Sequence, residues 1–139
     1  MKDITHQIMQ MQAMVHRAIM RGVDQEKVSA GQPKVLAFLK NHEGLSQKDV
    51  AKACQIEPGS LTVLLNRMEA LGMVDRRRAE GNRRSLFVYL TSYGHELADQ
   101  VVSRFYEVEQ LAFAGVTEKE LATFDRVCQK VLANLEKVE

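Results

Sequence analysis

The sequence predicts a single, mainly helical domain that carries one small β-hairpin. Apolar residues recur at helical spacing through most of the 139-residue chain. Residues 73–91 depart from that spacing and have the pattern of two strands joined by a turn at residues 79–82. The composition, 45% hydrophobic and 27% charged, is that of a globular domain with a core of its own.

The N-terminal part is expected to form two helices. Between Ile4 and Ile19 apolar residues recur at steps of three and four, which is one face of a helix that ends near Gly22. A second helix is expected to start at Pro33, because proline is tolerated at a first helical position, and to stop at residues 41–44. An apolar stripe like the first one is typical of a core or of a contact with a partner helix.

Two short helices are expected in the centre of the chain. Ser46 is a candidate N-cap with Asp49 three residues later, and the helix that follows stops at a break over residues 55–57. The next helix starts at Pro58 and stops at Gly72, and its predicted buried stripe is Leu61, Leu64, Leu65, Met68 and Leu71. This arrangement is typical of a helix-turn-helix, whose second helix can lie in the DNA major groove. An ordinary helical hairpin with a polar outer face fits the same pattern.

The predicted β-hairpin follows the second of these helices directly and is basic. The segment from Arg76 to Ser85 holds five of the 19 Lys and Arg residues, although the whole chain has a formal net charge of only +1. Residues 46–90 carry eight basic and five acidic side chains, whereas residues 91–139 carry five and nine. A solvated loop would account for an isolated charge run. A basic hairpin directly after a helix-turn-helix is typical of the wing of a winged helix-turn-helix, and it indicates DNA as the partner.

The DNA contacts are expected on two surfaces. The outer face of the second short helix offers small residues for close approach, hydroxyl and amide groups for base edges, and a valine for a thymine methyl group. The predicted contact residues on this helix are Gly59, Ser60, Thr62, Val63, Asn66 and Arg67. The hairpin is expected to reach phosphates and the minor groove. Its predicted contact residues are Arg76, Arg77, Arg78, Asn82, Arg83 and Arg84.

The C-terminal part is expected to form two longer helices. Thr91 is a candidate N-cap for the first, and residues 117–120 have the pattern of a capping box for the second. Their apolar stripes exceed what a winged helix-turn-helix lobe of residues 33–90 can bury. Residues 1–22 and 92–139 are therefore expected to form a dimer interface, which would let two recognition helices read two half-sites.

The chain resembles the MarR family of bacterial transcriptional regulators over nearly its whole length. The family's recognition-helix pattern matches the segment SLTVLLNRMEALGMVDR at Thr62, Arg67, Met68, Glu69 and Gly72. The family's wing signature matches the segment NRRSLFVYLTSYG at Arg84, Leu90, Thr91 and Gly94. Two positions depart from the family's pattern: Asn82 stands where an acidic residue is usual, and Val63 stands where a basic residue is common.

The resemblance implies a homodimer that binds a pseudo-palindromic operator as a sequence-specific regulator. Proteins of this family are usually repressors that are released by a small aromatic ligand or by cysteine oxidation. In a protein of this shape, a cleft lies where the first two helices and the helix after Thr91 meet the winged lobe. Its expected lining is Met14, Met20 and Phe38, with His16 and Arg17 as partners for a small aromatic carboxylate. The alternative is that His16 and Arg17 face solvent.

Two other binding functions are compatible with a winged helix. One is a sequence-tolerant architectural DNA-binding protein, which would ordinarily be more basic over the whole chain. The other is a winged-helix module for protein interaction, but such modules tend to lose the basic wing that this chain keeps. The basic wing on a nearly neutral chain therefore favours a sequence-specific regulator.

Other classes of function are disfavoured. The four histidines are scattered without paired metal spacing, and no phosphate loop or catalytic triad is recognisable, so no metal, cofactor or enzyme activity is expected. Cys54 and Cys128 each lie on or beside an apolar stripe and are expected to be core residues. In the redox-sensing branch of the family the reactive cysteine lies in the first helix, where this chain has none. No membrane span or secretory leader is apparent, so a reducing cytoplasm is the expected location.

Overall fold

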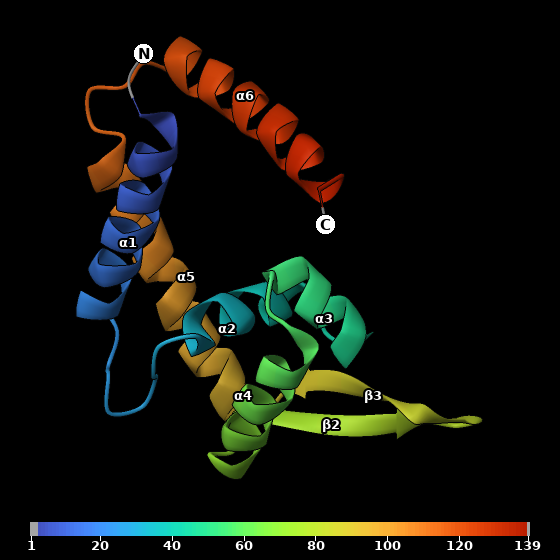
Figure 1. Ribbon diagram of the computed structural model, residues 1–139. Helices are drawn as coiled ribbons and strands as arrows, with labels where there is room; N and C mark the ends of the chain where they lie inside the picture. Colours follow the sequence, from blue (N-terminus) through green and yellow to red (C-terminus); the bar gives the residue numbers. More distant parts are fainter. Residues whose placement is uncertain (1–2, 139) are drawn as a thin grey trace. The chain divides into compact units, whose positions relative to one another are not determined.

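The structure, a computed structural model, describes residues 3–138, with the side chains of Asn82 and Arg83 outside that description (Figure 1). Its helices are α1 (Ile4–Arg21), α2 (Gln32–Asn41), α3 (Gln47–Cys54), α4 (Pro58–Ala70), α5 (Ser92–Ala112) and α6 (Glu118–Glu136). Its strands are β1 (Leu45–Ser46), β2 (Val74–Ala79) and β3 (Asn82–Leu90). The chain divides into two compact units, Met1–Tyr106 and Glu107–Glu139. The predicted fold class, mainly helical with one small β-hairpin, is confirmed.

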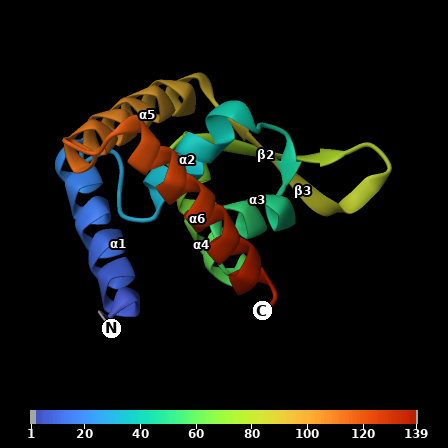
Figure 2. The ribbon, with the colours of Figure 1, turned by 90° about the horizontal axis from the view of Figure 1, so that it is seen from above.

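The β-hairpin lies where the sequence predicts it. β2 pairs antiparallel with β3, from Val74 opposite Leu90 to Arg78 opposite Leu86, and the register shifts between Arg78 and Ala79. In both views the two strands extend away from α2, α3 and α4 (Figures 1 and 2). The hairpin therefore presents its side chains beyond the helices of the lobe, as a wing does.

A short third strand, β1, was not predicted. Leu45 pairs with Val88 and Ser46 with Phe87, which gives an antiparallel sheet in the order β1-β3-β2. Two residues are too few to show an alternating pattern in the sequence. Ser46 is also the N-cap of α3, where its Oγ accepts a hydrogen bond from the backbone N–H of Asp49 at 3.2 Å. The strand therefore ties the helix-turn-helix directly to the wing.

The predicted helix caps are confirmed. Thr91 Oγ1 accepts a hydrogen bond from the backbone N–H of Gly94 at 2.9 Å, at the start of α5. At the start of α6, Thr117 Oγ1 accepts from the Glu120 backbone at 3.1 Å, and Glu120 Oε1 accepts from the Thr117 backbone at 3.0 Å. This reciprocal pair is the capping box that the sequence indicates.

The first turn of α5 is pressed against the base of the hairpin. A Cβ atom at Gly94 would lie 2.0 Å from the carbonyl oxygen of Met73, a distance that no real contact reaches, so only glycine fits without a backbone shift. Thr91 joins the same place, because its backbone N–H donates to the Met73 carbonyl oxygen at 3.0 Å and its hydroxyl donates to the Gly72 carbonyl oxygen at 2.6 Å. The base of the hairpin and the first turn of α5 are therefore in close contact at this point, which is called the joint below.

The core of the first unit lies between the helix-turn-helix, α2, the sheet and α5. Its fully buried side chains include Leu36, Leu39, Leu61, Leu65, Met68 and Val88. The same cluster also contains Val28, Leu97 and Val101. The core is therefore wider than the predicted lobe of residues 33–90, since it takes in the segment before α2 and the first half of α5.

One residue of the predicted stripe of α4 is not buried. Leu71 is 56% exposed, so its predicted place in the buried stripe is wrong. The reason is that α4 ends at Ala70 and Leu71 is its C-cap, so the angular spacing of a helix no longer applies to it. Leu64 is half-buried, whereas Leu61, Leu65 and Met68 are fully buried.

The helices α1 and α6 have no buried residue among those described. The exposed apolar side chains of α1 are Ile4, Ile8, Met9, Met11, Met14 and Val15. Those of α6 are Leu121, Phe124, Val127, Val131, Leu132 and Leu135. No helix in the described part of the chain is long and apolar enough to cross a membrane. Apolar faces of this extent on such helices are typical of protein interaction surfaces.

The stability of the lobe is expected to depend on Leu65 and hardly on Leu71. Leu65→Ala should lower the free energy of unfolding by about 2–5 kcal/mol, because it leaves a cavity in a fully packed core. Leu71→Ala removes the same number of atoms from an exposed position and should change it by less than about 0.5 kcal/mol. Urea unfolding followed by circular dichroism measures both. Equal losses in the two variants would contradict the rotation of α4 described above.

Candidate nucleic-acid interface

The outward face of α4 is polar and accessible. α4 packs against α3 and β2, and it buries Leu61, Leu65 and Met68 in the core. The opposite face carries the predicted contact residues, all of them exposed: Gly59, Ser60, Thr62, Val63, Asn66 and Arg67. The helix is thus held by its neighbours while one polar face stays open to a partner.

The hairpin beside α4 carries exposed positive charge. Three of its predicted contact residues are exposed, namely Arg77, Arg78 and Arg84. The side chains of Asn82 and Arg83 lie outside the described residues, so their predicted contacts stay predictions. The guanidinium carbon of Arg77 lies 4.3 Å from the centroid of the Tyr89 ring on the neighbouring strand. This cation–π contact holds the Arg77 charge along the strand instead of at the tip.

Arg76 differs from these arginines, because its side chain is only 12% exposed. Its Nε and Nη2 donate to the carboxylate of Glu69 at 3.3 and 3.1 Å, and its backbone N–H donates to the same carboxylate at 3.2 Å. Nη1 donates to Gln47 Oε1 at 3.1 Å, and Nη2 donates to Asn66 Oδ1 at 2.6 Å. The structure therefore places Arg76, predicted as a wing contact to DNA, in a network that joins β2 to α3 and α4.

The carboxylate of Glu69 is stabilised by this network. Hydrogen bonds from the Arg76 side chain lower the pKa of Glu69, the nearby positive charge and the backbone N–H add to the effect, and partial burial opposes it. Glu69 is therefore ionised throughout the neutral range. An ionised Glu69 keeps the Arg76 guanidinium against α4.

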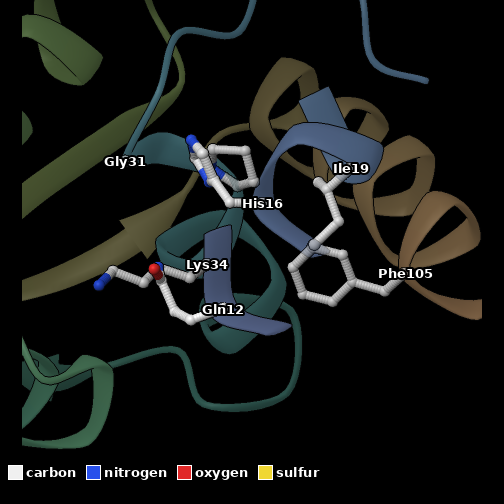
Figure 3. Close-up of a pocket in the computed structure, with 7 residues that line it drawn as sticks. Gln12, His16, Ile19, Gly31, Lys34 and Phe105 are labelled. Atoms are coloured by element: carbon white, nitrogen blue, oxygen red, sulfur yellow. The ribbon is translucent and has the colours of Figure 1, made fainter. Parts of the chain in front are cut away.

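A small pocket lies in the same unit, between α1, α2 and α5. It has a volume of about 220 Å³, and its lining residues are Gln12, His16, Ile19, Gly31, Pro33, Lys34 and Phe105. Ile19 and Phe105 point toward one another, while His16 and Lys34 come from different helices (Figure 3). Apolar walls with a few polar groups are typical of sites for small molecules.

Of the five residues predicted for a ligand site, only His16 lines this pocket. Met14 and Arg17 are exposed on α1, and Met20 is half-buried near its end. Phe38 packs against the core and stacks on His42, with the ring centroids 4.3 Å apart. A cation does line the pocket, but it is Lys34 and not Arg17.

The chain is similar in sequence and structure to known regulators. It matches the MarR family model over residues 27–85. The HTH-type transcriptional regulator PecS of Dickeya dadantii is 30% identical over 110 residues, which are 77% of this chain and 66% of PecS. The crystal structure of the S. aureus MepR–DNA complex aligns with a TM-score of 0.86 at 22% identity, over 96% of this chain and 99% of that chain. That of the Streptomyces coelicolor PcaV regulator, in complex with its natural ligand, aligns with a TM-score of 0.83 at 20% identity, over 95% and 93%.

The chain belongs to the MarR family. The family consists of DNA-binding transcriptional regulators, and its fold is the winged helix described above. The match over residues 27–85 covers α2, the helix-turn-helix and most of the hairpin, which are the elements that carry the candidate interface.

Two residues of this MarR-family surface were missed by reasoning from the sequence. Glu69 was noted only as a match to the family pattern, although it lies three residues after Asn66 and so shares its side of α4. An acidic residue on that side of α4, shortly before an arginine-rich strand, could have indicated an ion pair between the helix and the strand. Gln47 lies on α3, and no spacing in the sequence relates it to Arg76.

The two cysteines of this MarR-family chain differ in burial: Cys54 is buried in the core and Cys128 is half-buried. Cys54 is buried, its Sγ donates to the Lys34 carbonyl oxygen at 3.9 Å, and desolvation raises the pKa of its thiol, while the charge of Lys34 opposes this. A thiol with a raised pKa is a poor nucleophile, which agrees with the predicted core role. Cys128 is half-buried. Within residues 3–138, no group of three His, Cys, Asp or Glu side chains could hold a metal ion.

The network around Arg76 should make stability depend on pH. Because the pKa of Glu69 is lowered in the folded protein, its contribution is complete above the ordinary glutamate pKa of about 4.3 and is lost as the pH falls through the lowered value. Glu69→Gln should therefore be less stable than the wild type at pH 7, by up to about 1 kcal/mol for a pair near the surface. Melting temperatures measured from pH 7 to pH 3 should converge. A difference that persists or grows at low pH would contradict the lowered pKa.

Proposed function

We propose that this protein is a sequence-specific transcriptional regulator that binds a pseudo-palindromic operator as a homodimer and acts as a repressor. The observation that carries the proposal is the exposed polar face of α4 beside a hairpin with exposed arginines. An α-helix fits the major groove, where each base pair presents a distinct pattern of donors and acceptors. The proposal includes no catalytic step.

The two surfaces have different tasks in this proposal. Thr62 and Asn66 lie one turn apart on α4 and offer polar atoms to base edges, while Val63 offers an apolar contact to a thymine methyl group. Arg78 and Arg84 on the hairpin offer positive charge to phosphates and to the narrow minor groove. The MepR protein, with the same fold, was solved in complex with DNA. Base reading belongs to α4, and most of the salt-dependent affinity belongs to the wing.

The homodimer is supported by the apolar faces of α1 and α6. Neither helix has a buried residue among those described, and each carries a series of exposed apolar side chains. A second copy of the chain would bury them and set two copies of α4 at a fixed spacing, as a two-fold symmetric operator requires.

The pocket supports control by a small anionic ligand. Its volume of about 220 Å³ is suited to a single-ring compound, Phe105 offers an aromatic wall, and His16 and Lys34 offer partners for a carboxylate. The PcaV regulator was solved in complex with its natural ligand. Release from DNA by a factor of ten to a hundred requires the ligand to favour the non-binding dimer by about 1.4–2.8 kcal/mol.

The experiment that tests the DNA-binding function is selection of bound duplexes from a random pool, followed by competition with unrelated DNA. A sequence-specific regulator should enrich one two-fold symmetric site and prefer it by about 10³-fold or more. Binding without enrichment would identify an architectural DNA-binding protein instead. No binding at moderate salt would identify a protein-interaction module.

The wing is expected to contribute charge to this binding. Arg84→Ala should weaken operator binding and reduce the slope of log affinity against log salt by about one unit, because one phosphate contact is lost. Lys130→Ala removes the same charge from α6 and should leave the slope unchanged. Fluorescence anisotropy at several salt concentrations measures both variants. Equal slopes for the wild type and a folded Arg84→Ala variant would contradict the wing assignment.

The face of α1 is expected to hold the dimer. Ile8→Glu places a charge in the middle of the exposed apolar stripe and should give monomers or aggregates with loss of operator binding. Gln7→Glu adds the same charge on the neighbouring exposed position and should remain a dimer. Sedimentation velocity distinguishes the two. A dimeric Ile8→Glu variant with full operator affinity would show that the interface lies elsewhere.

A small aromatic carboxylate such as salicylate should release the preformed operator complex at up to millimolar concentration. Lys34→Met should weaken the release while leaving operator binding intact, because it removes a cation from the pocket. Lys27→Met, outside the lining, is the matched control. Neither release nor a shift in melting temperature with the wild type would remove the aromatic-acid hypothesis.

A further inference from the structure

The network around Arg76 connects the two side chains of α4 that are best suited to reading bases. Arg76 bonds directly to Asn66, and it reaches Thr62 through Gln47. All of these groups are exposed or half-buried at the surface of the lobe, beside the open face of α4. The inference developed from this network rests on the proposed function, since it concerns which bases α4 reads.

The bond between Arg76 and Asn66 fixes the orientation of the Asn66 amide. A guanidinium has five N–H donors and no acceptor, so the group that faces it at 2.6 Å must be the amide oxygen. The two N–H bonds of the Asn66 amide are then directed away from Arg76. In the described part of the chain, these N–H bonds have no acceptor, and Asn66 is exposed. Asn66 therefore offers hydrogen-bond donors outward.

The same reasoning fixes the orientation of the Gln47 amide. Its oxygen accepts from Nη1 of Arg76 at 3.1 Å, so its nitrogen is the atom that donates to Thr62 Oγ1 at 3.3 Å. The Thr62 hydroxyl in turn donates its single proton to the carbonyl oxygen of Pro58 at 3.0 Å. With that proton committed and one lone pair occupied, Thr62 has only an acceptor left to offer outward.

We propose that Arg76 sets the hydrogen-bonding polarity of the recognition helix, so that Asn66 reads base acceptors and Thr62 reads base donors. Arg76 is then a positioning residue for sequence recognition, and it is not one of the DNA contacts of the wing. Glu69 holds Arg76 in this position, because its carboxylate accepts hydrogen bonds from both Nε and Nη2 of the guanidinium.

This polarity restricts the bases that the two residues favour. In the major groove guanine presents two acceptors, N7 and O6, and thymine presents O4, whereas adenine presents N7 beside its N6 donor group and cytosine presents only the N4 donor group. Asn66 should therefore favour guanine or thymine on the strand that it faces and should disfavour cytosine most. The Asn–adenine pair needs the amide oxygen as an acceptor, and Arg76 already uses that oxygen. Thr62 should favour cytosine or adenine, whose N4 and N6 amino groups are donors.

The test is duplex selection from a random pool with the full-length wild type and with variants of Asn66 and Thr62. Asn66→Ala and Thr62→Ala first locate the operator positions that each residue reads, as the positions where base preference disappears. The wild type should show guanine or thymine at the Asn66 position by about tenfold or more over cytosine. Cytosine or adenine as the preferred base at the Asn66 position would overturn the proposal.

Asn66→Asp reverses the polarity in an isosteric side chain. One carboxylate oxygen can stay with Arg76, and the other presents an acceptor outward in place of the N–H donors. Base preference at the Asn66 position should switch to cytosine or adenine, while the other positions keep their preference. Repulsion from the phosphates should lower the affinity for all duplexes to a similar degree. An Asn66→Asp variant that selects the same base as the wild type would overturn the proposal.

Arg76→Met removes all the side-chain donors and leaves a side chain of comparable length. With both amides free to rotate, base preference at the Asn66 and Thr62 positions should fall to less than about threefold, because a rotating amide satisfies either pattern. Arg77→Met removes the same charge from the same strand; because Arg77 is one of the predicted wing contacts, it should lower the affinity for all duplexes to a similar degree and keep the base preference at both positions. A folded Arg76→Met variant with wild-type preference at both positions would contradict the role of Arg76.

A second variant keeps the proposal testable if Arg76→Met does not fold. Gln47→Leu removes the donor to Thr62 and one of the acceptors of Arg76, while Glu69 and Asn66 still accept from Arg76. Base preference should therefore be lost at the Thr62 position and kept at the Asn66 position. Loss at both positions, or at neither, would contradict the chain of hydrogen bonds. A wild type that binds DNA without enriching any duplex would refute the proposed regulatory function itself, and the reading of bases with it. Enrichment by the wild type together with unchanged variants refutes only the inference about Arg76.

Discussion

Burial of Leu61, Leu65 and Met68 is the constraint on which the candidate interface depends. These three side chains fix the rotation of α4 about its own axis, because a turn of the helix would expose apolar surface at roughly 25 cal/mol per Å². Once that rotation is fixed, the outward residues are determined at 100° per residue. The same burial brings Asn66 and Glu69 to the side of α4 that faces β2, where Arg76 bonds to both. Packing in the core thus decides which polar atoms a partner meets.

The arginines of the hairpin have different surroundings although they are close in sequence. Arg76 faces α4 at the base of the hairpin, where oxygen atoms of three neighbouring side chains accept its hydrogen bonds. Arg78 and Arg84 lie farther toward the tip and are exposed. Position along the hairpin therefore separates an arginine that is largely buried against α3 and α4 from arginines whose side chains are exposed.

Most of the fold follows from the sequence, because stripes, caps and turns are local signals. The capping box of α6, the N-cap Thr91 and the hairpin are all where the pattern indicates them. Leu71 was misplaced because the pattern does not show which residue ends α4. The hydrogen bonds of Arg76 to Gln47 and Asn66 could not be predicted, because they form only where β2 and α3 lie beside α4. A tertiary contact of this kind has no corresponding periodicity in the sequence. For the same reason the lining of the pocket, which comes from three helices, could not be derived from spacing, and of the residues expected at a ligand site it includes His16.

The close contact between Gly94 and the Met73 carbonyl couples the orientation of the hairpin to that of α5. The first turn of α5 and the base of the hairpin are held together by this packing and by the hydrogen bonds of Thr91 to Gly72 and Met73, so a tilt of α5 is expected to move the hairpin with it. β3 has nine residues, and at about 3.3 Å per residue its far end lies roughly 30 Å from the joint. On that length a tilt of about 5° displaces the tip by roughly 2–3 Å, a shift comparable to one hydrogen-bond length. Phe105 in the wall of the pocket lies on the same helix as the joint. A change of packing at Phe105 that tilts α5 would therefore move the far end of β3 farther than its base.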